Sequence, residues 1–338
     1  MAKIVFYEAS EADKVQLTEG LKTTDHHWEF VPYPLTTDTA DAEAEVVSIF
    51  VGHSHVTGQV MDKMPMLKLI ATRSTGFDHI DLAAATNRGI TVVNVPSYGE
   101  NTVAEHVFTL LLALARKLPQ TLDTTKDGVY CPTDLSGFDL KGKTLGIVGM
   151  GRIGQHSARI GRGFGMNVVG FDVFKKPEIA EEIGFAYAPL EDVLKTADVV
   201  TLHAPLTPEN VHLMDSARIG MMKDGAILIN TARGELVDTH ALIAALENGH
   251  LSGAGLDTIE GERFLSEEIE INTVLDNKTT KEALVNLAET ETLLRMPQVI
   301  VTPHSAYNTF EAVGRINATT ADNIIKFWYG ETPNKVNK

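Results

Sequence analysis

Short apolar runs alternate with helical patterns along almost the whole chain. Most of these runs are rich in β-branched residues, and several are largely apolar rather than alternating, as expected for strands that are buried on both faces of a sheet. Strands that alternate with helices favour parallel sheets covered by helices, so the pattern predicts an α/β fold. The predicted strands are residues 3–7, 46–51, 68–71, 91–94, 144–148, 167–172, 199–203, 226–231, 252–257 and 299–302.

The segments between the strands include one strong helix and two irregular stretches. Residues 101–118 are apolar on most faces and predict a buried helix, which we expect Pro119 to end. Residues 121–143 have turn residues and little periodicity, which predicts a loop. Residues 263–291 are acidic and lack strand signals, so we expect a surface excursion with some helix.

The same pattern predicts two domains. A helix at residues 309–329 closes the chain, and we expect it to return to the first domain. The first domain would then be discontinuous, with residues 1–100 and 305–338. Residues 101–304 would form a second domain inserted into it.

Composition excludes several classes of function. The chain has 338 residues, and its formal net charge of −16 opposes binding to nucleic acid or to anionic lipid. The single cysteine, Cys131, leaves no disulfide framework and no Cys-rich zinc site. Adjacent or near-adjacent histidines (26 and 27, 53 and 55) lack acidic partners at ligand spacing, so we expect no metal site. The chain shows no signal-peptide pattern and no apolar run of membrane-spanning length, so we expect a cytoplasmic protein.

A glycine-rich turn lies where a dinucleotide-binding fold requires one. Gly149, Gly151 and Gly154 form a GxGxxG motif between a predicted strand and a predicted helix. The following strand ends at Asp172, which suits hydrogen bonds to ribose hydroxyls and repels a 2′-phosphate. Lys175 and Lys176 oppose that preference slightly. The sequence therefore predicts a dinucleotide site that favours NAD.

Three further loops each follow a predicted strand of the same domain. Residues 230–234 carry Arg233, whose guanidinium fits a carboxylate. Residues 257–262 carry several carboxylates, and residues 302–306 carry His304, a side chain suited to proton transfer near neutral pH. Because parallel sheets bind ligands at the carboxyl ends of their strands, the three loops predict an anion clamp, a proton donor and a carboxylate partner.

The motifs, in this order, resemble the D-isomer-specific 2-hydroxyacid dehydrogenase family, and most of all its D-lactate dehydrogenase branch. The similarity covers nearly the whole chain, and the loop that ends in Glu262 and the aromatic Tyr307 resemble the lactate branch in particular. The resemblance implies two Rossmann-like domains with parallel sheets. It rests on Asn94-Val95-Pro96, residues 101–106 (NTVAEH), 149–154 (GMGRIG), 202–208 (LHAPLTP), 230–234 (NTARG), Leu256-Asp257 with Glu262, and 302–306 (TPHSA).

The resemblance also implies a role for each matched residue. Arg233 would bind the substrate carboxylate, His304 would exchange a proton with the substrate oxygen, and Glu262 would hold His304 and favour its protonated form. The substrate would further contact Ser74, Thr75, Gly76 and Tyr98. NAD would contact Gly149, Gly151, Arg152, Ile153, Gly154, Asp172, His203, Ala204, Pro205, Asn210, Thr231, Ala232 and Asp257.

The implied reaction is reduction of a small 2-oxo acid, with pyruvate as the expected substrate, in a homodimer. Thr75 and Asn308 depart from the pattern of the lactate branch, and residues 265–291 form a longer segment than in close relatives. Other 2-oxo acids therefore stay open as substrates, including hydroxypyruvate, glyoxylate and branched acids. A second hypothesis is an NAD-sensing co-repressor, since such family members can keep the same three residues.

Overall fold

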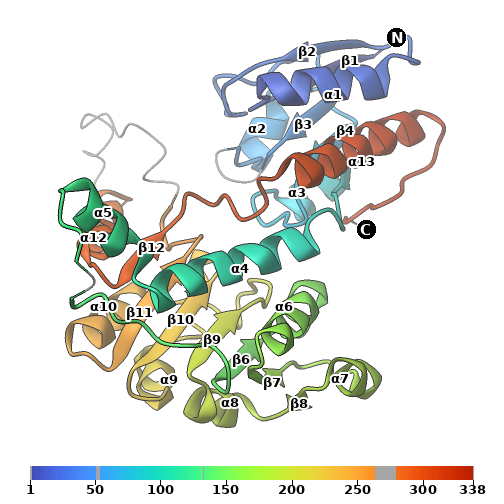
Figure 1. The fold of residues 1–338 in the computed structure, drawn as a ribbon. Coiled ribbons are helices and arrows are strands. Elements are labelled where there is room, and N and C mark those ends of the chain that lie inside the picture. Colours follow the sequence, from blue (N-terminus) through green and yellow to red (C-terminus); the bar gives the residue numbers. More distant parts are fainter. Residues whose placement is uncertain (1, 51–53, 132, 263–278, 338) are drawn as a thin grey trace. The chain divides into compact units, whose positions relative to one another are not determined.

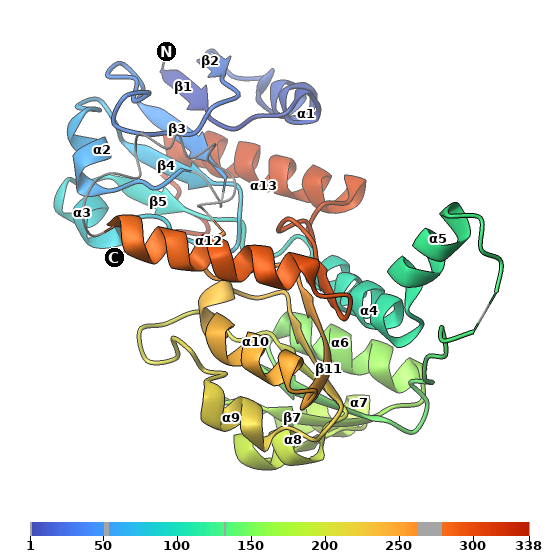
Figure 2. The same cartoon turned by 90° about the vertical axis from the view of Figure 1, so that its left-hand side faces the viewer.

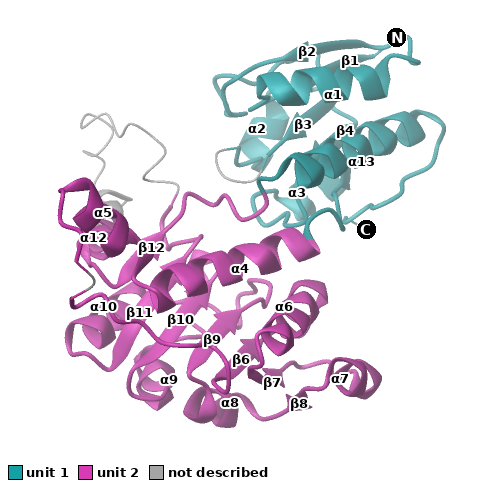
Figure 3. Cartoon of the chain, viewed as in Figure 1, with its two compact units in different colours: residues 1–99, 308–338 teal, residues 100–307 magenta. Residues whose placement is uncertain are grey.

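The computed structural model describes residues 2–50, 54–131, 133–262 and 279–337. The chain forms two compact units (Figure 3). Unit 1 contains residues 1–99 and 308–338, and unit 2 contains residues 100–307. Both are built on parallel sheets, which confirms the predicted α/β class. Among the described residues, no helix combines the length and the apolar character needed to cross a membrane.

Unit 1 is a five-stranded sheet in the order β2-β1-β3-β4-β5. One face packs against α1 and α13 through Ile4, Leu17 and Ile324, and the other packs against α2 and α3 through Val5, Val60 and Ala85. The alternation of Ile4 and Val5 between the two faces follows from the two-residue period of a strand. The elements are β1 (Lys3–Phe6), α1 (Glu11–Leu21), β2 (His27–Phe30), β3 (Val46–Ile49), α2 (Gly58–Asp62), β4 (Leu69–Thr72), α3 (Leu82–Asn87), β5 (Thr91–Val93) and α13 (Phe310–Trp328).

Unit 2 is a seven-stranded sheet in the order β12-β11-β10-β9-β6-β7-β8. Its strand order reverses between β6 and β9, which is where doubly wound sheets bind nucleotides. The strands are β6 (Thr144–Val148), β7 (Asn167–Phe171), β8 (Ala186–Tyr187), β9 (Val199–Leu202), β10 (Ala226–Asn230), β11 (Leu251–Leu256) and β12 (Val299–Val301). The helices are α4 (Glu100–Ala115), α5 (Leu118–Lys126), α6 (Arg152–Gly163), α7 (Pro177–Ile183), α8 (Leu190–Thr196), α9 (Ser216–Met221), α10 (Thr239–Glu247) and α12 (Thr279–Arg295).

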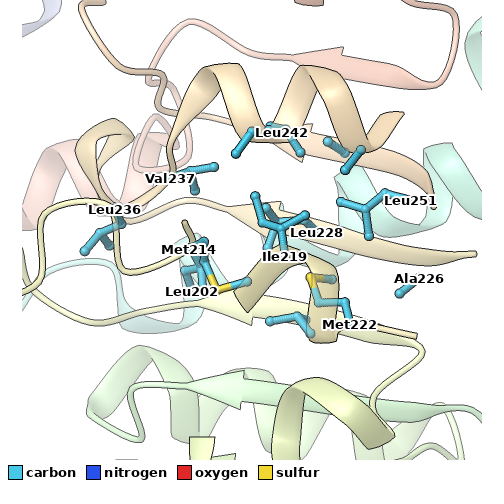
Figure 4. Packing of buried hydrophobic residues seen from close by; sticks show 14 of the residues in the cluster. Leu202, Met214, Ile219, Met222, Ala226, Leu228, Leu236, Val237, Leu242 and Leu251 are labelled. Atoms are coloured by element: carbon cyan, nitrogen blue, oxygen red, sulfur yellow. The ribbon is translucent and has the colours of Figure 1, made fainter. Parts of the chain in front are cut away.

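Helices cover both faces of this sheet (Figure 1). On one face, Ile227 and Ile229 of β10 pack with α4 and α6. On the other, Leu228 packs with residues of α8, α9 and α10; Figure 2 labels α9 and α10, and Figure 4 shows side chains of this cluster. Because β10 is apolar from Ala226 to Ile229, both faces gain from burial, roughly 25 cal/mol per Å² of apolar surface. The sheet is therefore a rigid support for the loops at its edges.

Two expectations about local structure were wrong. Leu118–Lys126 is a helix, α5, although residues 121–143 were predicted to be a loop. Pro119 lies in its first turn, where proline needs no hydrogen-bonded NH, so it begins this helix rather than only ending the one before. The edge strands β2 and β8 were not predicted, because they are short and only half-buried.

The acidic segment is only partly described. Residues 263–278 lie outside the described residues. From Thr279 to Arg295 the segment is helix α12, which leads into β12.

Candidate active site

The glycine-rich turn joins β6 to α6. Gly149 has φ 98°, and a Cβ there would lie 2.7 Å from the main-chain nitrogen of Ala204. A Cβ at Gly154 would lie 2.1 Å from the carbonyl oxygen of Gly149, so both positions require glycine. Gly151 is the N-cap of α6 and has no side chain to bond the first amides of the helix. These amides and the helix dipole suit a pyrophosphate.

Asp172 is fixed directly against this turn. Its Oδ2 accepts a hydrogen bond from the main-chain NH of Met150 at 2.7 Å, and its Oδ1 accepts one from Phe174 at 2.8 Å. The carboxylate therefore stands at the end of β7 with a defined orientation. It suits the hydroxyls of a ribose whose pyrophosphate lies on the N-terminus of α6.

Arg233 follows β10 in a turn that Asn230 shapes. The buried amide of Asn230 donates to the carbonyl of Arg233 at 2.8 Å and accepts from the NH of Ala232 at 3.0 Å. Arg233 itself bonds the carbonyl of Ala232 at 2.8 Å. A Cβ at Gly234 would lie 2.1 Å from the carbonyl carbon of Ile259, so this turn packs tightly on the loop that carries the carboxylates.

His304 and Glu262 form an ion-pair geometry at the ends of β12 and β11. His304 Nδ1 lies 2.8 Å from Glu262 Oε1, and both side chains are partly exposed. His304 has φ 48°, a conformation that costs a non-glycine residue about 1–3 kcal/mol unless its surroundings enforce it. A histidine whose Nδ1 faces a carboxylate directs its Nε2 away from that partner, where it can meet a substrate.

The carboxylate of Asp257 holds the main chain around His304. It accepts hydrogen bonds from the hydroxyl of Thr302 at 2.6 Å and from the NH groups of Ser305 and Ala306, both at 2.9 Å. His106 approaches the same carboxylate at 3.4 Å and Thr302 at 2.9 Å. Burial alone would raise the pKa of Asp257, but these hydrogen bonds together lower it.

Two threonine hydroxyls at the same edge of the sheet are buried without a partner among the described residues. They belong to Thr231, after β10, and Thr258, after β11. Buried hydroxyls are normally hydrogen-bonded, because desolvation without a partner costs about 1–3 kcal/mol. Their positions between the glycine-rich turn and His304 fit a bound molecule that supplies the missing partners.

Unit 1 has its own loop at the carboxyl end of β4. Ser74 is buried and donates to the carbonyl of Gly76 at 2.6 Å, and Thr75 donates to the carbonyl of Val95 at 2.9 Å. These side-chain bonds fold residues 74–76 back on themselves and fix their main chain. The half-buried Tyr98 has its carbonyl bonded by Arg315 of α13.

Comparison with known proteins identifies the family of this chain. Residues 108–306 match the model of the D-isomer specific 2-hydroxyacid dehydrogenase NAD binding domain. D-lactate dehydrogenase of Escherichia coli is 35% identical over 339 residues, which cover 99% of each chain.

This chain belongs to the D-isomer-specific 2-hydroxyacid dehydrogenase family.

Two further relatives of this family frame the question of substrate. Glyoxylate reductase of Thermococcus litoralis is 39% identical over 291 residues, covering 84% of this chain and 81% of the relative. The crystal structure of Aquifex aeolicus D-lactate dehydrogenase complexed with NAD and lactic acid has a TM-score of 0.83 and 36% identity, covering 97% of this chain and 96% of that one.

The chain is therefore an NAD-dependent D-2-hydroxyacid dehydrogenase. The residues present fit the cofactor: the turn at Gly149 excludes any side chain, Gly151 leaves helix amides open, and two buried hydroxyls lack hydrogen-bond partners among the described residues. Substrates of this family are small 2-oxo and 2-hydroxy acids. Among the described residues, no group of three or more His, Cys, Asp or Glu side chains could hold a metal ion, and His53 lies outside them.

The remaining residues assigned from the motifs support the nucleotide side of unit 2. His203 bonds Ser157 of α6 at 3.1 Å and Thr201 at 3.2 Å, and burial lowers the pKa of His203 to about 3. Asn210 folds the loop after β9 by bonding the carbonyl of Pro205 and the NH of Thr207, both at 2.7 Å. Arg152, in the first turn of α6, pairs with Glu100 at 3.3 Å, and Ile153 follows it.

Asn230, Thr258 and Thr302 were not given a role from the sequence. All three lie inside motifs that were recognised, but a polar side chain within a motif does not reveal which groups it meets in the fold. A separate cavity of about 450 Å³ opens at the other edge of the sheet, lined by Leu114, Phe138 and Ser252 among others. It lies at the amino ends of the strands, so it is not part of the site built by the loops after β10, β11 and β12.

Proposed function

We propose that this chain reduces pyruvate to D-lactate with NADH, with His304 as the acid/base. The observation that carries the proposal is the 2.8 Å contact between His304 and Glu262 at the ends of neighbouring strands, beside the loop of Arg233. Reduction of a carbonyl needs a proton donor and a cation near the developing alkoxide. The three residues supply both.

Each of the three residues has a defined role in the proposed reaction. NADH, when bound, supplies the hydride. Arg233 binds the substrate carboxylate through its planar fork and polarises the carbonyl. His304 gives a proton from Nε2 to the carbonyl oxygen, and Glu262 stabilises the imidazolium that exists before the transfer. Ser74, Thr75 and Gly76 bind the substrate carboxylate from unit 1, and Tyr98 limits the side-chain end.

The cofactor residues divide by the part of the dinucleotide that they hold. The turn residues Gly149, Gly151, Arg152, Ile153 and Gly154 bind the pyrophosphate, and Asp172 binds the adenosine ribose. His203, Ala204, Pro205, Asn210, Thr231, Ala232 and Asp257 border the rest. Because the anchored carboxylate of Asp172 opposes a 2′-phosphate, NADH should give a higher kcat/KM than NADPH, and Asp172→Ala should narrow the difference. Equal values for the two cofactors in the parent enzyme would refute this role.

Glyoxylate reduction is the second candidate function. It is supported by the 39% identity to the Thermococcus litoralis glyoxylate reductase. Pyruvate is favoured because the similarity to D-lactate dehydrogenases covers 97–99% of this chain, slightly more than the 84–93% covered by glyoxylate reductases of Thermococcus litoralis and Thermococcus kodakarensis. The resemblance to the lactate branch at Tyr98 and Tyr307 also favours a small acid over larger ones such as phenylpyruvate.

Oxidation of NADH with a panel of 2-oxo acids tests the proposal directly. Pyruvate should give the highest kcat/KM among pyruvate, glyoxylate, branched 2-oxo acids and phenylpyruvate. A clear preference for glyoxylate would establish the second candidate instead. If NADH binds but no 2-oxo acid is turned over, the chain is an NAD-sensing protein of the co-repressor kind.

The assembly belongs to the same proposal: a homodimer in the cytoplasm. Every residue of α5, all of which the structure describes, is exposed or half-buried, including Leu118 and Leu122 at about half exposure. Tyr130, just after this helix, is 97% exposed. Such an apolar helix face suits an interface with a second copy. Leu122→Glu should therefore yield monomers in a light-scattering measurement of mass, and a parent protein that is itself monomeric would refute the dimer.

A further inference from the structure

Glu8 is held in an unusual conformation at the carboxyl end of β1. Its φ is 54°, in the left-handed region that non-glycine residues rarely adopt. Its NH donates to the carbonyl of Tyr33 at 3.2 Å, and its own carbonyl accepts from Arg73 at 3.1 Å. Strained residues of this kind persist where the surroundings enforce them, and they cluster at functional sites. His304 has the same conformation at the end of β12.

A buried cation enforces the conformation of Glu8. Arg73 is 2% exposed, and it bonds the carbonyls of both Tyr7, at 2.7 Å, and Glu8. It also donates to Ser48 at 3.1 Å and lies over the ring of Phe50 at 6.0 Å. Burying a guanidinium is unfavourable without such partners. Arg73 therefore fixes the main-chain turn at Tyr7 and Glu8 from inside unit 1.

Only one of the two carboxylate oxygens of Glu8 has hydrogen-bond partners among the described residues. Oε2 accepts hydrogen bonds from the NH of Phe50 at 3.1 Å and from the hydroxyl of Ser54 at 2.6 Å. Ser54 in turn accepts from the NH of Leu35 at 2.9 Å, so its own proton goes to Glu8. Oε1 is buried and has no hydrogen-bond partner among the described residues. A buried carboxylate oxygen with no donor is costly unless a ligand supplies one.

Glu8 lies on the edge of the sheet that carries the proposed carboxylate-binding loop. It is two residues beyond the end of β1, and Ser74 is two residues beyond the end of β4. Only β3 separates the two strands, and the register pairs Phe6 with Ser48 and Ile49 with Thr72. The two strand ends are thus roughly 10 Å apart, a span that a glutamate side chain and a three-carbon acid cover together.

We propose that Glu8 is a specificity-determining residue whose Oε1 accepts a hydrogen bond from a hydroxyl on C3 of the 2-oxo acid. The inference rests on the proposed function, because it takes residues 74–76 as the carboxylate site. It extends the substrate class to hydroxypyruvate, and it favours this acid over 2-oxobutyrate, which has a methyl in place of the hydroxyl. The same carboxylate repels acids with a second carboxylate, such as oxaloacetate.

Glu8→Gln is the sharpest variant because the structure fixes its orientation. Two donors, Phe50 NH and the Ser54 hydroxyl, meet Oε2, so the amide must place its oxygen there and its NH₂ where Oε1 was. We expect the ratio of kcat/KM for hydroxypyruvate to that for 2-oxobutyrate to fall about tenfold, the loss of a charge-assisted hydrogen bond. The ratio for oxaloacetate to pyruvate should rise about tenfold.

Two controls separate specificity from support of the fold. Glu11→Gln removes a glutamate whose side chain is 89% exposed on α1, and it should change neither ratio. Ser54→Ala removes a donor to Oε2 but leaves Oε1 in place. It should therefore change kcat/KM for all substrates by the same factor and leave both ratios unchanged. If Glu8→Gln also changes kcat/KM for all substrates by the same factor, Glu8 only supports the fold and the proposal is overturned.

A measurement on the parent enzyme covers the case in which Glu8→Gln does not fold. D-Glycerate and D-2-hydroxybutyrate, as product inhibitors, differ by the same hydroxyl and involve no carbonyl reactivity. D-Glycerate should inhibit about tenfold more tightly, and equal inhibition would overturn the proposal. If the parent enzyme reduces pyruvate but Glu8→Gln leaves both kcat/KM ratios unchanged, only the role of Glu8 is refuted. If the parent enzyme reduces no 2-oxo acid, the proposed function itself is refuted.

Discussion

Two histidine–glutamate pairs in unit 2 share one contact distance but differ in the contacting ring nitrogen and in their surroundings. His304 lies 2.8 Å from Glu262, and His212 lies 2.8 Å from Glu260. Both histidines have a positive φ, 48° and 52°, and the two glutamates are two residues apart on one loop. Contact distance and residue type therefore do not tell which pair performs chemistry, but the ring nitrogen differs: His304 contacts its glutamate through Nδ1 and His212 through Nε2.

Position on the sheet separates the pairs. His304 follows β12 directly, and Asp257, after β11, holds its main chain. His212 lies within the long loop after β9, where its NH bonds the carbonyl of Glu235. Its partner Glu260 also accepts from Thr239, at the start of α10, at 3.2 Å. We infer that the first pair acts on substrate, and that the second joins two loops.

Replacing the histidines should give the largest difference between the pairs. His304→Gln should lower kcat for 2-oxo acid reduction by on the order of 10³, because general acid catalysis contributes about 10²–10⁴. His212→Gln should stay within about threefold of the parent. Steady-state NADH oxidation measures both, and similar losses in the two variants would remove the distinction drawn here.

Arg233 adds the cation that we assign to the first pair. Arg233→Lys should lower kcat/KM by about 10²-fold, raising KM and lowering kcat, because a point charge cannot replace a bidentate fork. Arg218→Lys is the matched control near the second pair, since Arg218 bonds the carbonyl of Leu213 at 3.0 Å. It should leave the kinetics unchanged. An unaffected KM in Arg233→Lys would contradict carboxylate binding by Arg233.

The pH profile should sharpen the comparison further. Glu262→Gln keeps the hydrogen bond but removes the charge that favours the protonated imidazole. The pH profile of pyruvate reduction should therefore move to lower pH, and the rising limb of lactate oxidation should move with it. Glu260→Gln should leave both profiles in place. The opposite pattern would exchange the roles of the two glutamates.

The smallest effect concerns stability at the second pair. The hydrogen bond that His212 donates to Glu260 raises the pKa of His212, so the pair stabilises the fold at pH values below the unfolded pKa of about 6.5. This contribution is lost as pH rises through the raised pKa of the folded state. His212 is partly exposed and screened, so Glu260→Gln should cost less than about 1 kcal/mol near pH 5.5 and nothing at about pH 9. Urea unfolding at the two pH values measures this, and a cost that grows with pH would contradict it.

The sequence by itself determined the family, the α/β class and the loops that carry the chemistry. The signals were local: a GxGxxG turn between a strand and a helix, and polar residues directly after apolar strands. Parallel strands end at the same edge of a sheet, so Arg233 and His304 could be assigned to one region without coordinates.

The tertiary structure alone decided which side chains meet. The resemblance singled out Glu262 as the partner of His304, but only the folded loops show that Glu260 pairs with His212, across 48 residues, while Glu262 pairs with His304, across 42. The same holds for the corner at Glu8, which Arg73 fixes across 65 residues. Such pairs depend on loop conformations that are set by packing against distant segments. A local sequence pattern does not encode that packing, so these contacts can be seen only in the folded structure.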